Sequence, residues 1–357
     1  MQTKSKSIVV WLSLCFVIIG LHIFLDGISR LKESGFSIAN WKKVEHFISA
    51  SNEDEFDKIF QEYKTMPQFS KAFPDMELPE FKSIYVIEYA KYIINVIEFF
   101  IFFIPFVIFC VLRKFTIRQI LQLTFVFAIG LLKYPLQDYF LSNNLIENVN
   151  FAPYRLSQTV ALNYIFFALI LWQILSFSYP KSEIGGFELE KPSLFLKIFA
   201  CITVGLIFLQ IVEGGAVSGL NAGLSYNTFP KMDGKWVPDE ILLQPIEVSY
   251  ENIFEDVATA QFFHRFIASI TVIALILFWI LGHNSPHVAH LLPILFSIVV
   301  VEFLLGVLTL LFAVPITLTS LHQANVLLVF AISVTIMHRL FIPKKTIAYD
   351  IGYEESK

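Results

Sequence analysis

Long apolar runs, separated by short charged segments, dominate the chain. Runs of about 20 residues are long enough to cross a bilayer as α-helices. We predict eight such spans, of which the two least regular carry Glu88 and Lys91, and Lys133. The predicted spans are residues 8–25, 84–112, 119–141, 156–178, 194–213, 258–282, 291–313 and 318–341. The pattern therefore predicts an all-α membrane protein.

The composition supports this fold class. Hydrophobic residues make up 56% of the chain and charged residues 16%, which differs from the usual balance of soluble domains. A net charge of −4 gives no signal for nucleic-acid binding, so we expect contact with membrane lipid and not with nucleic acid. All three cysteines lie within predicted spans (Cys15, Cys110 and Cys201), which argues against a disulfide framework or a CxxC metal site.

The distribution of Lys and Arg predicts the orientation. An even number of spans places both termini on one side of the membrane, and the short loops on that side are the more basic ones. We therefore expect cytoplasmic termini, a cytoplasmic tail at 342–357 and a location in a bacterial inner membrane. The first span is interpreted as an uncleaved helix. The acidic and aromatic outer loop at 27–83 is expected to form a small amphipathic cap.

The chain contains an internal repeat. Residues 26–41 read DGISRLKESGFSIANW, and residues 214–229 read GGAVSGLNAGLSYNTF. An offset of 188 residues aligns Gly27 with Gly215 and Gly35 with Gly223. Each segment follows the first span of a set of four. We therefore predict two tandem, pseudosymmetric four-helix bundles, residues 1–178 and 194–341.

Two histidines lie inside predicted spans at similar depth. From the nearest span end, His264 is roughly 9 Å and His322 roughly 6 Å deep, at the helical rise per residue. An imidazole in hydrocarbon needs a hydrogen-bond partner or a metal. Neighbouring helices pack about 8–10 Å apart, so the pair is a candidate for the two axial ligands of one heme iron. The alternative is that each imidazole bonds a carbonyl or a carboxylate.

The first bundle lacks the corresponding histidines. Aligning QFFHR (261–265) with EYAKY (88–92) places Lys91 at the position of His264, and Thr159 lies near the level of His322. No histidine occurs between His46 and His264, which excludes ligation by two histidines in this half. Lys91 either ligates iron as a free amine, pairs with Glu88 at i,i+3, or extends to the lipid headgroups.

Other polar residues leave alternatives open. Arg265 either pairs a porphyrin propionate or extends to the interface. Glu98 and Glu302 are carboxylates inside predicted spans, where they serve a proton relay or bond a neighbouring helix. The turn with His283, His287 and His290 has the spacing for a metal, although a solvated turn is the more common interpretation.

Three motifs resemble one known family. The strings AGLSYNTFPKMDGKWVP (222–238), QFFHR (261–265) and LTSLHQ (318–323) are similar to those of heme A synthases of the proteobacterial and mitochondrial type. The N-terminal strings ISRLKESGFSIANW (28–41), EFDKIFQEYKTMPQF (55–69) and FKSIYVIEY (81–89) also fit this type's long first outer loop, so the resemblance covers essentially the whole chain. It implies the same eight helices and the same duplication.

The resemblance also implies a chemistry. Such enzymes oxidise the C8 methyl of heme O to a formyl group by successive hydroxylations, with oxygen from water, to make heme A for terminal oxidases. By motif, His264 and His322 would be the axial iron ligands of a heme b cofactor, with Arg265 beside it. The N-terminal half would hold the substrate heme O near a catalytic Glu88. The family's two histidines in that half correspond here to Lys91 and Thr159. A heme O synthase and an electron acceptor are the implied partners.

Two other functions compete with this interpretation. One is a non-catalytic b-type cytochrome, or a heme-handling or electron-transfer membrane protein, derived from that enzyme. The other is a transporter built on tandem repeats, which is disfavoured because no span is interrupted by paired Gly and Pro at mid-membrane depth. The sequence identifies neither the electron acceptor nor the oligomeric state, and a homo-oligomer is left open.

Overall fold

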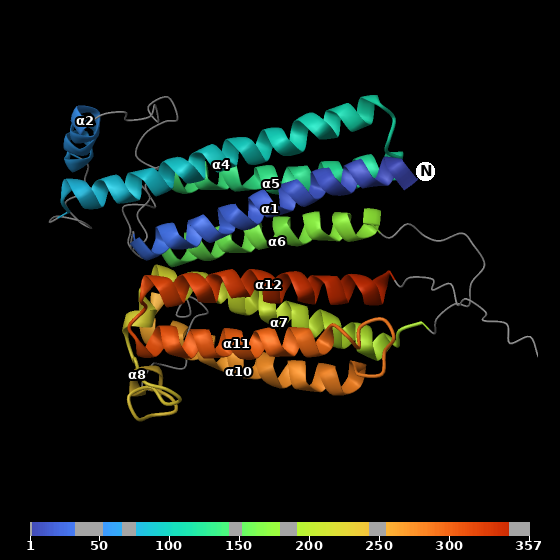
Figure 1. Cartoon of the computed structure of the whole chain (residues 1–357). Coiled ribbons are helices and arrows are strands. Elements are labelled where there is room, and N and C mark those ends of the chain that lie inside the picture. The colour runs from blue at the N-terminus through green and yellow to red at the C-terminus, as the bar shows by residue number, and fades with distance from the viewer. Residues whose placement is uncertain are drawn as a thin grey trace, which may run out of the picture.

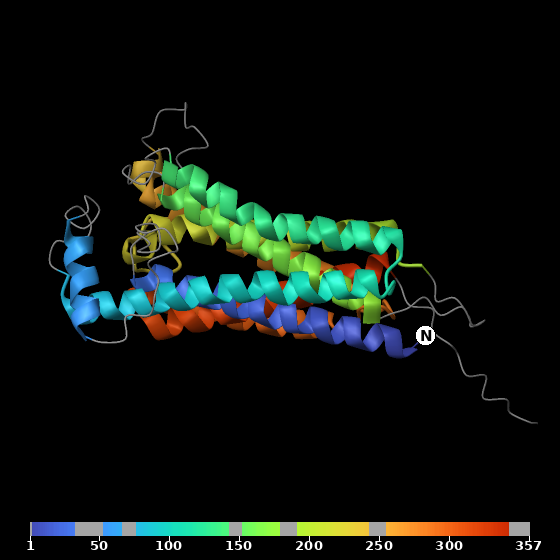
Figure 2. The same cartoon turned by 90° about the horizontal axis from the view of Figure 1, so that it is seen from above.

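Eight long helices, 20 to 34 residues each, form the body of the described structure. The structure, a computed structural model, describes residues 2–32, 53–65, 76–142, 152–178, 191–242 and 255–342. Figures 1 and 2 show the long helices running roughly side by side. They are α1 (Gln2–Lys32), α4 (Leu78–Val111), α5 (Ile117–Ser142), α6 (Ala152–Ser178), α7 (Leu194–Gly219), α10 (Val257–Gly282), α11 (Leu292–Leu311) and α12 (Ile316–Phe341).

Seven of these helices are long and apolar enough to cross a membrane, within the described residues. They are α1, α4, α6, α7, α10, α11 and α12. The predicted all-α, multi-pass membrane protein is therefore confirmed. The segment predicted as the third span is helical, as α5, but it is not among the seven, so its membrane crossing stays a prediction.

Local sequence signals set several helix ends. The Ser193 side chain accepts a hydrogen bond from the Leu196 amide and begins α7, and the Asp256 side chain does the same for the Thr259 amide at α10. One boundary differs from the expectation. α1 continues to Lys32, so the outer segment expected from residue 27 begins as helix. Gly27, which has poor helix propensity, lies inside this extension, where α1 contacts the Gln323 side chain of α12.

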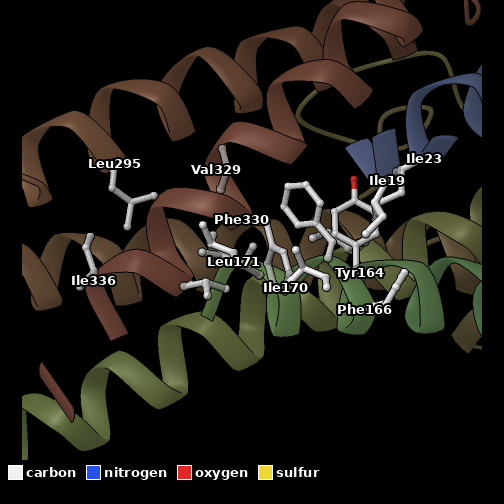
Figure 3. Close-up of a cluster of buried hydrophobic side chains, with 14 of the residues drawn as sticks. Ile19, Ile23, Tyr164, Phe166, Ile170, Leu171, Leu295, Val329, Phe330 and Ile336 are labelled. Carbon is white, nitrogen blue, oxygen red and sulfur yellow. The ribbon is translucent and has the colours of Figure 1, made fainter. Parts of the chain in front are cut away.

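The helices of the N-terminal half (residues up to 178) and the C-terminal half (residues 194–341) pack on one another through three pairs of helices. α6 lies against both α7 and α12, and α1 lies against α12. Within the halves, α1 contacts α4 and α6, while α7 contacts α10 and α12. Buried side chains from both halves form one hydrophobic core, shown in Figure 3, in which Tyr164 of α6 meets Phe330 of α12 edge-on at 5.4 Å between ring centroids.

The repeat-related glycines Gly27 and Gly215 lie at two of these contacts, α1 with α12 and α7 with α6. A Cβ built on Gly27 would overlap the amide of Gln323 on α12, and a Cβ on Gly215 would lie 2.8 Å from Cα of Ser157 on α6. Small residues let helix backbones approach closely in membrane proteins. The two glycines therefore serve the same purpose at equivalent helix contacts.

The short helices gather at one end of the molecule. α2 (Glu53–Lys64) and α8 (Asp239–Leu242) lie at the end opposite the N-terminus in Figure 1. The turn η4 (Ala222–Leu224) follows α7 and contacts α10 and α11. α2 is amphipathic, as expected: Phe60 and Tyr63 are buried against Phe81 of α4, while its acidic first turn is exposed.

Candidate functional site

A partly open cavity of about 420 Å³ lies mainly in the C-terminal half, and its volume is within the range of small-molecule and cofactor sites. Both His264 of α10 and His322 of α12 line it. The other lining residues lie between 207 and 329, apart from Gly27, Val160 and Tyr164 of the N-terminal half. Most of the surface that lines it is apolar, and valine is the most frequent lining residue. The two histidines that the sequence pairs therefore face one apolar cavity.

His264 is bonded to α7. Its Nδ1 lies 2.5 Å from Oε2 of the buried Glu213. The amide Nε2 of Gln210, one turn earlier on α7, lies 3.1 Å from both ring nitrogens and donates to the His264 carbonyl oxygen at 3.1 Å. α7 thus supplies a carboxylate and an amide to the same histidine.

His322 has a comparable neighbour on α11. Its Nδ1 lies 2.9 Å from Oε1 of Glu302, although the two groups are not aligned as a hydrogen bond. The Asn325 amide donates to Oε2 of Glu302 at 2.8 Å and to the Ile298 carbonyl oxygen at 3.0 Å. A small rotation of the imidazole would align it with a carboxylate whose position Asn325 already fixes.

A glycine lies opposite each imidazole. A Cβ on Gly214 would lie 3.5 Å from Cε1 of His264, and a Cβ on Gly306 would lie 3.2 Å from Cε1 of His322. The second distance is tighter than ordinary van der Waals contact. Absence of a side chain at these two positions leaves room for the rings at the cavity wall.

Arg265 lines the cavity from α10 and bonds the loop that follows α7. Its Nη2 donates to the Tyr226 carbonyl oxygen at 2.7 Å and its Nη1 to the Thr228 carbonyl oxygen at 2.8 Å. It also donates to Gln261 Oε1 at 3.0 Å. Its pairing with a propionate stays a prediction, and the structure assigns it contacts with the segment 226–228.

These residues fit a heme held by two histidines. Each imidazole has a carboxylate beside Nδ1, so Nε2 is the nitrogen that would bind the metal; at His264 the Gln210 amide, 3.1 Å from Nε2, would move aside for it. The wall between them is apolar, and glycines make space beside both rings. His264 and His322 would bind the iron, and the apolar wall would cover the macrocycle.

Lys91 and Glu88 lie in a polar cluster of the N-terminal half. Lys91 Nζ is 2.8 Å from Glu88 Oε1, 3.2 Å from Asp26 Oδ1 and 3.1 Å from Ser29 Oγ. Ser29 in turn donates to Glu88 at 2.5 Å. The i,i+3 ion pair of Lys91 and Glu88, one of the alternatives from the sequence, is present.

This arrangement matters for iron binding. An amine ligates iron through its lone pair, and the Lys91 ammonium directs its hydrogens to two carboxylates. Ligation would break both ion pairs and leave the buried charges of Asp26 and Glu88 without that cation. Thr159, near the level of the second family histidine, is half-buried on α6.

A second polar group in this half was not foreseen as a unit. His22 Nδ1 lies 2.7 Å from Glu98 Oε1, and Lys133 Nζ lies 2.6 Å from Glu98 Oε2. These residues belong to three different predicted spans, 8–25, 84–112 and 119–141. Only helix packing brings α1, α4 and α5 together around one carboxylate.

Sequence reasoning also missed Glu213, Gln210 and Asn325. The available signal was a carboxylate in an apolar run next to a Gly-Gly pair, in the string QIVEGG. In the histidine-rich turn, His290 accepts from Arg339 at 2.6 Å. Within the described ranges no group of three metal-binding side chains is arranged to hold an ion.

Comparison with known proteins gives the family. The sequence profile of the cytochrome oxidase assembly protein family matches residues 9–334. The chain is 32% identical to a protein named heme A synthase from Nitrosospira multiformis over 340 residues, which is 94% of each chain. The chain belongs to the heme A synthase family.

Relatives in other lineages support this membership. A heme A synthase of Flavobacterium psychrophilum is 33% identical over 345 residues, 94% of this chain and 98% of the relative. One from Wolbachia pipientis wMel is 31% identical over 331 residues, 92% of this chain and 91% of the relative. The resemblance seen in the three motifs therefore extends over nearly the full length of these heme A synthases.

Proposed function

We propose that this protein is a heme A synthase that oxidises the C8 methyl of heme O to a formyl group, with heme b as its cofactor. The observation that carries the proposal is the apolar cavity onto which His264 and His322 both open. Membership of the heme A synthase family supports the reaction. When bound, the heme would accept and pass on electrons drawn from the substrate methyl group.

The chain's own residues would divide the work. His264 and His322 would bind the cofactor iron, and the apolar wall would exclude water from the macrocycle. Arg265 would hold the loop segment 226–228 over the cavity. In the N-terminal half, Glu88, which is only 1% exposed, would be the carboxylate nearest the substrate heme O. An electron acceptor and a heme O synthase would be the partners.

The proposal includes an architecture and a location. We propose eight membrane spans, with α5 as the eighth, in two tandem four-helix bundles related by a pseudo-two-fold axis. The matching roles of Gly27 and Gly215 between the halves support this arrangement. The basic residues near the chain ends favour cytoplasmic termini, and the bacterial relatives support a location in a bacterial inner membrane.

One observation favours a second candidate function. The ion pairs of Lys91 with Asp26 and Glu88 occupy the position where a histidine would bind the substrate iron. A b-type cytochrome or heme-handling protein would keep the heme of the C-terminal half and do without the oxidation. The two functions make the same prediction for His264 and His322, and opposite predictions for the product.

Pigment analysis separates the two functions. The full chain is expressed together with a heme O synthase, purified in detergent, and its hemes are extracted and separated by chromatography. Hydroxymethyl or formyl heme is the result expected of the enzyme. Bound heme b with unmodified heme O would establish the second candidate instead.

Histidine variants test the cofactor site. His264→Ala and His322→Ala are each expected to abolish the heme b signal in a pyridine hemochrome spectrum. His283→Ala, in an exposed turn, is the matched control and should keep it. Full heme b content in both cavity variants would contradict the assignment.

A further inference from the structure

Each of the two cavity histidines has its own membrane-embedded glutamate, supplied by a neighbouring helix. Glu213 of α7 lies 2.5 Å from Nδ1 of His264, and Glu302 of α11 lies 2.9 Å from Nδ1 of His322. Neither glutamate shares a helix with its histidine. The carboxylates come from two helices and meet two others, so the arrangement depends on the packing of the whole C-terminal half.

Burial of these two carboxylates in the membrane-spanning part of the protein costs free energy. The side chain of Glu213 is 4% exposed and that of Glu302 is 13% exposed, both on helices apolar enough to cross a membrane. A buried carboxylate is expensive unless it is paired or hydrogen-bonded. For Oε2 of Glu213 the imidazole of His264 is such a partner, while Oε1 has none among the described residues. The one hydrogen-bonded oxygen of Glu213 therefore contacts His264, a histidine that lines the cavity.

The second glutamate is fixed in a different way. Asn325 donates to Oε2 of Glu302 and to the Ile298 carbonyl oxygen, which ties the carboxylate to α12. The remaining oxygen, Oε1, faces Nδ1 of His322. Asn325 follows His322 by three residues, so the histidine and the residue that positions its carboxylate share one face of α12.

We propose that Glu213 and Glu302 are positioning residues for the heme ligands: they hold each imidazole with Nδ1–H toward the carboxylate and Nε2 toward the iron, and they lower the reduction potential of the heme. This inference rests on the proposed binding of heme b between His264 and His322. A carboxylate that accepts the Nδ1 hydrogen fixes the tautomer and ring orientation and raises the basicity of the ligand. A more basic ligand stabilises the ferric iron more than the ferrous iron.

A lower reduction potential of the heme would affect electron flow in the proposed reaction. A lower potential makes the reduced heme a stronger electron donor, which favours the passage of electrons to the acceptor. The same geometry explains why two carboxylates are kept in an apolar cavity wall, although an apolar side chain of similar volume would cost less there.

The test is a redox titration of the purified, heme-loaded protein at one fixed pH. Glu213→Gln and Glu302→Gln keep the side-chain shape and remove the carboxylate. Each is expected to keep its heme and to favour reduction at least tenfold more than the unaltered protein, which is a shift of about 59 mV to higher potential for a one-electron couple. Asn325→Ala, which releases Glu302, should shift the potential in the same direction by less.

Glu98→Gln is the matched control. Glu98 is also a buried carboxylate beside a histidine, His22, but it lies in the N-terminal half away from the cavity. Its substitution should leave the heme potential unchanged. An equal shift in this control, or no shift in either cavity variant, would overturn the proposal while leaving the heme assignment intact.

A second variant, Glu213→Asp, tests the proposal in the case that Glu213→Gln loses its heme. Should Glu213→Gln reduce heme content, Glu213→Asp is expected to restore it, because the carboxylate returns. A Glu213→Asp protein that stays as heme-poor as the Gln variant would overturn the positioning role. Failure of the proposed cofactor site would look different: the unaltered protein would carry no heme b, or His264→Ala would keep it.

Discussion

Asp26 and Lys91 form an ion pair of 3.2 Å across α1 and α4, at the two positions that the internal repeat assigns to Gly214 and His264. In the C-terminal half the corresponding positions also meet, since a Cβ on Gly214 would lie 3.5 Å from Cε1 of His264. Both halves therefore keep the same helix contact. A glycine makes room for an imidazole in one, and a carboxylate pairs with an ammonium in the other.

This difference concerns the substrate half of the proposed enzyme. A heme bound there would find an ammonium and two carboxylates in place of an imidazole from α4. Its iron would then lack a histidine from α4, α5 or α6, because the sequence has none between residues 46 and 264, and His22 of α1 is paired with Glu98. Substrate binding in this half would rest on contacts with the macrocycle and its substituents.

Removal of the Lys91 ammonium should destabilise the folded protein. Lys91→Met leaves Asp26 and Glu88 buried without it, and we expect a loss of about 3–5 kcal/mol in the free energy of unfolding. Adding Asp26→Asn to this variant should recover part of the loss, because one buried charge is removed. Denaturant titration of the detergent-solubilised protein measures both effects.

An exposed ion pair supplies the control for that experiment. Lys82 donates to Glu53 at 3.0 Å, and the Glu53 side chain is 91% exposed. Lys82→Met should cost only about 0–1 kcal/mol. Similar losses in Lys82→Met and Lys91→Met would show that the Lys91 cluster is not a buried, charge-balanced unit.

The sequence predicted the helices better than it predicted their polar contacts. Apolar run length located all eight long helices, because a membrane span has to satisfy its own backbone. The pairing of His264 with Glu213 could not be predicted from the sequence. Glu213 was the last residue of a predicted span, and the residue that it contacts depends on how α7 packs against α10. Likewise, Asp26 was placed at a span end, and only the continuation of α1 brings it to Lys91.

The contact between the halves should be sensitive to side-chain size. Gly215→Ala would place its Cβ 2.8 Å from the backbone of Ser157, so α6 and α7 have to move apart. We expect a loss of about 1–3 kcal/mol in the free energy of unfolding, as for other overpacked sites.

Gly205 on the same helix is the control. A Cβ at Gly205 has nothing within 4 Å, so Gly205→Ala should be neutral or stabilise α7 by up to about 1 kcal/mol. Thermal unfolding of the two variants under one detergent condition compares them. A destabilised Gly205→Ala together with an unaffected Gly215→Ala would contradict this account of the interface.

Gly214 and Gly306, the glycines beside the two imidazoles, should differ in how well they tolerate substitution by alanine. Gly306→Ala brings a Cβ to 3.2 Å from His322 and forces the ring to shift, whereas Gly214→Ala reaches an ordinary contact of 3.5 Å with His264. Displacement of a ligand from its supported position costs about 10–100-fold in metal affinity. We therefore expect weakened heme binding in Gly306→Ala and near-normal binding in Gly214→Ala, measured by heme titration of the heme-depleted protein. Equal affinities in the two variants would contradict the prediction.

Arg265 should control the access of a protease to the loop between α7 and α10. Its guanidinium donates to the carbonyl oxygens of Tyr226 and Thr228, just before the exposed Lys231 and Lys235. Arg265→Met removes both hydrogen bonds, which should increase local opening of this segment. We expect trypsin to cleave after these lysines several-fold faster than in the unaltered protein, as judged by mass spectrometry of timed digests. Arg339→Met, which breaks the contact with His290 instead, should leave that cleavage rate unchanged, and an equal acceleration in both variants would show that Arg265 does not hold the loop.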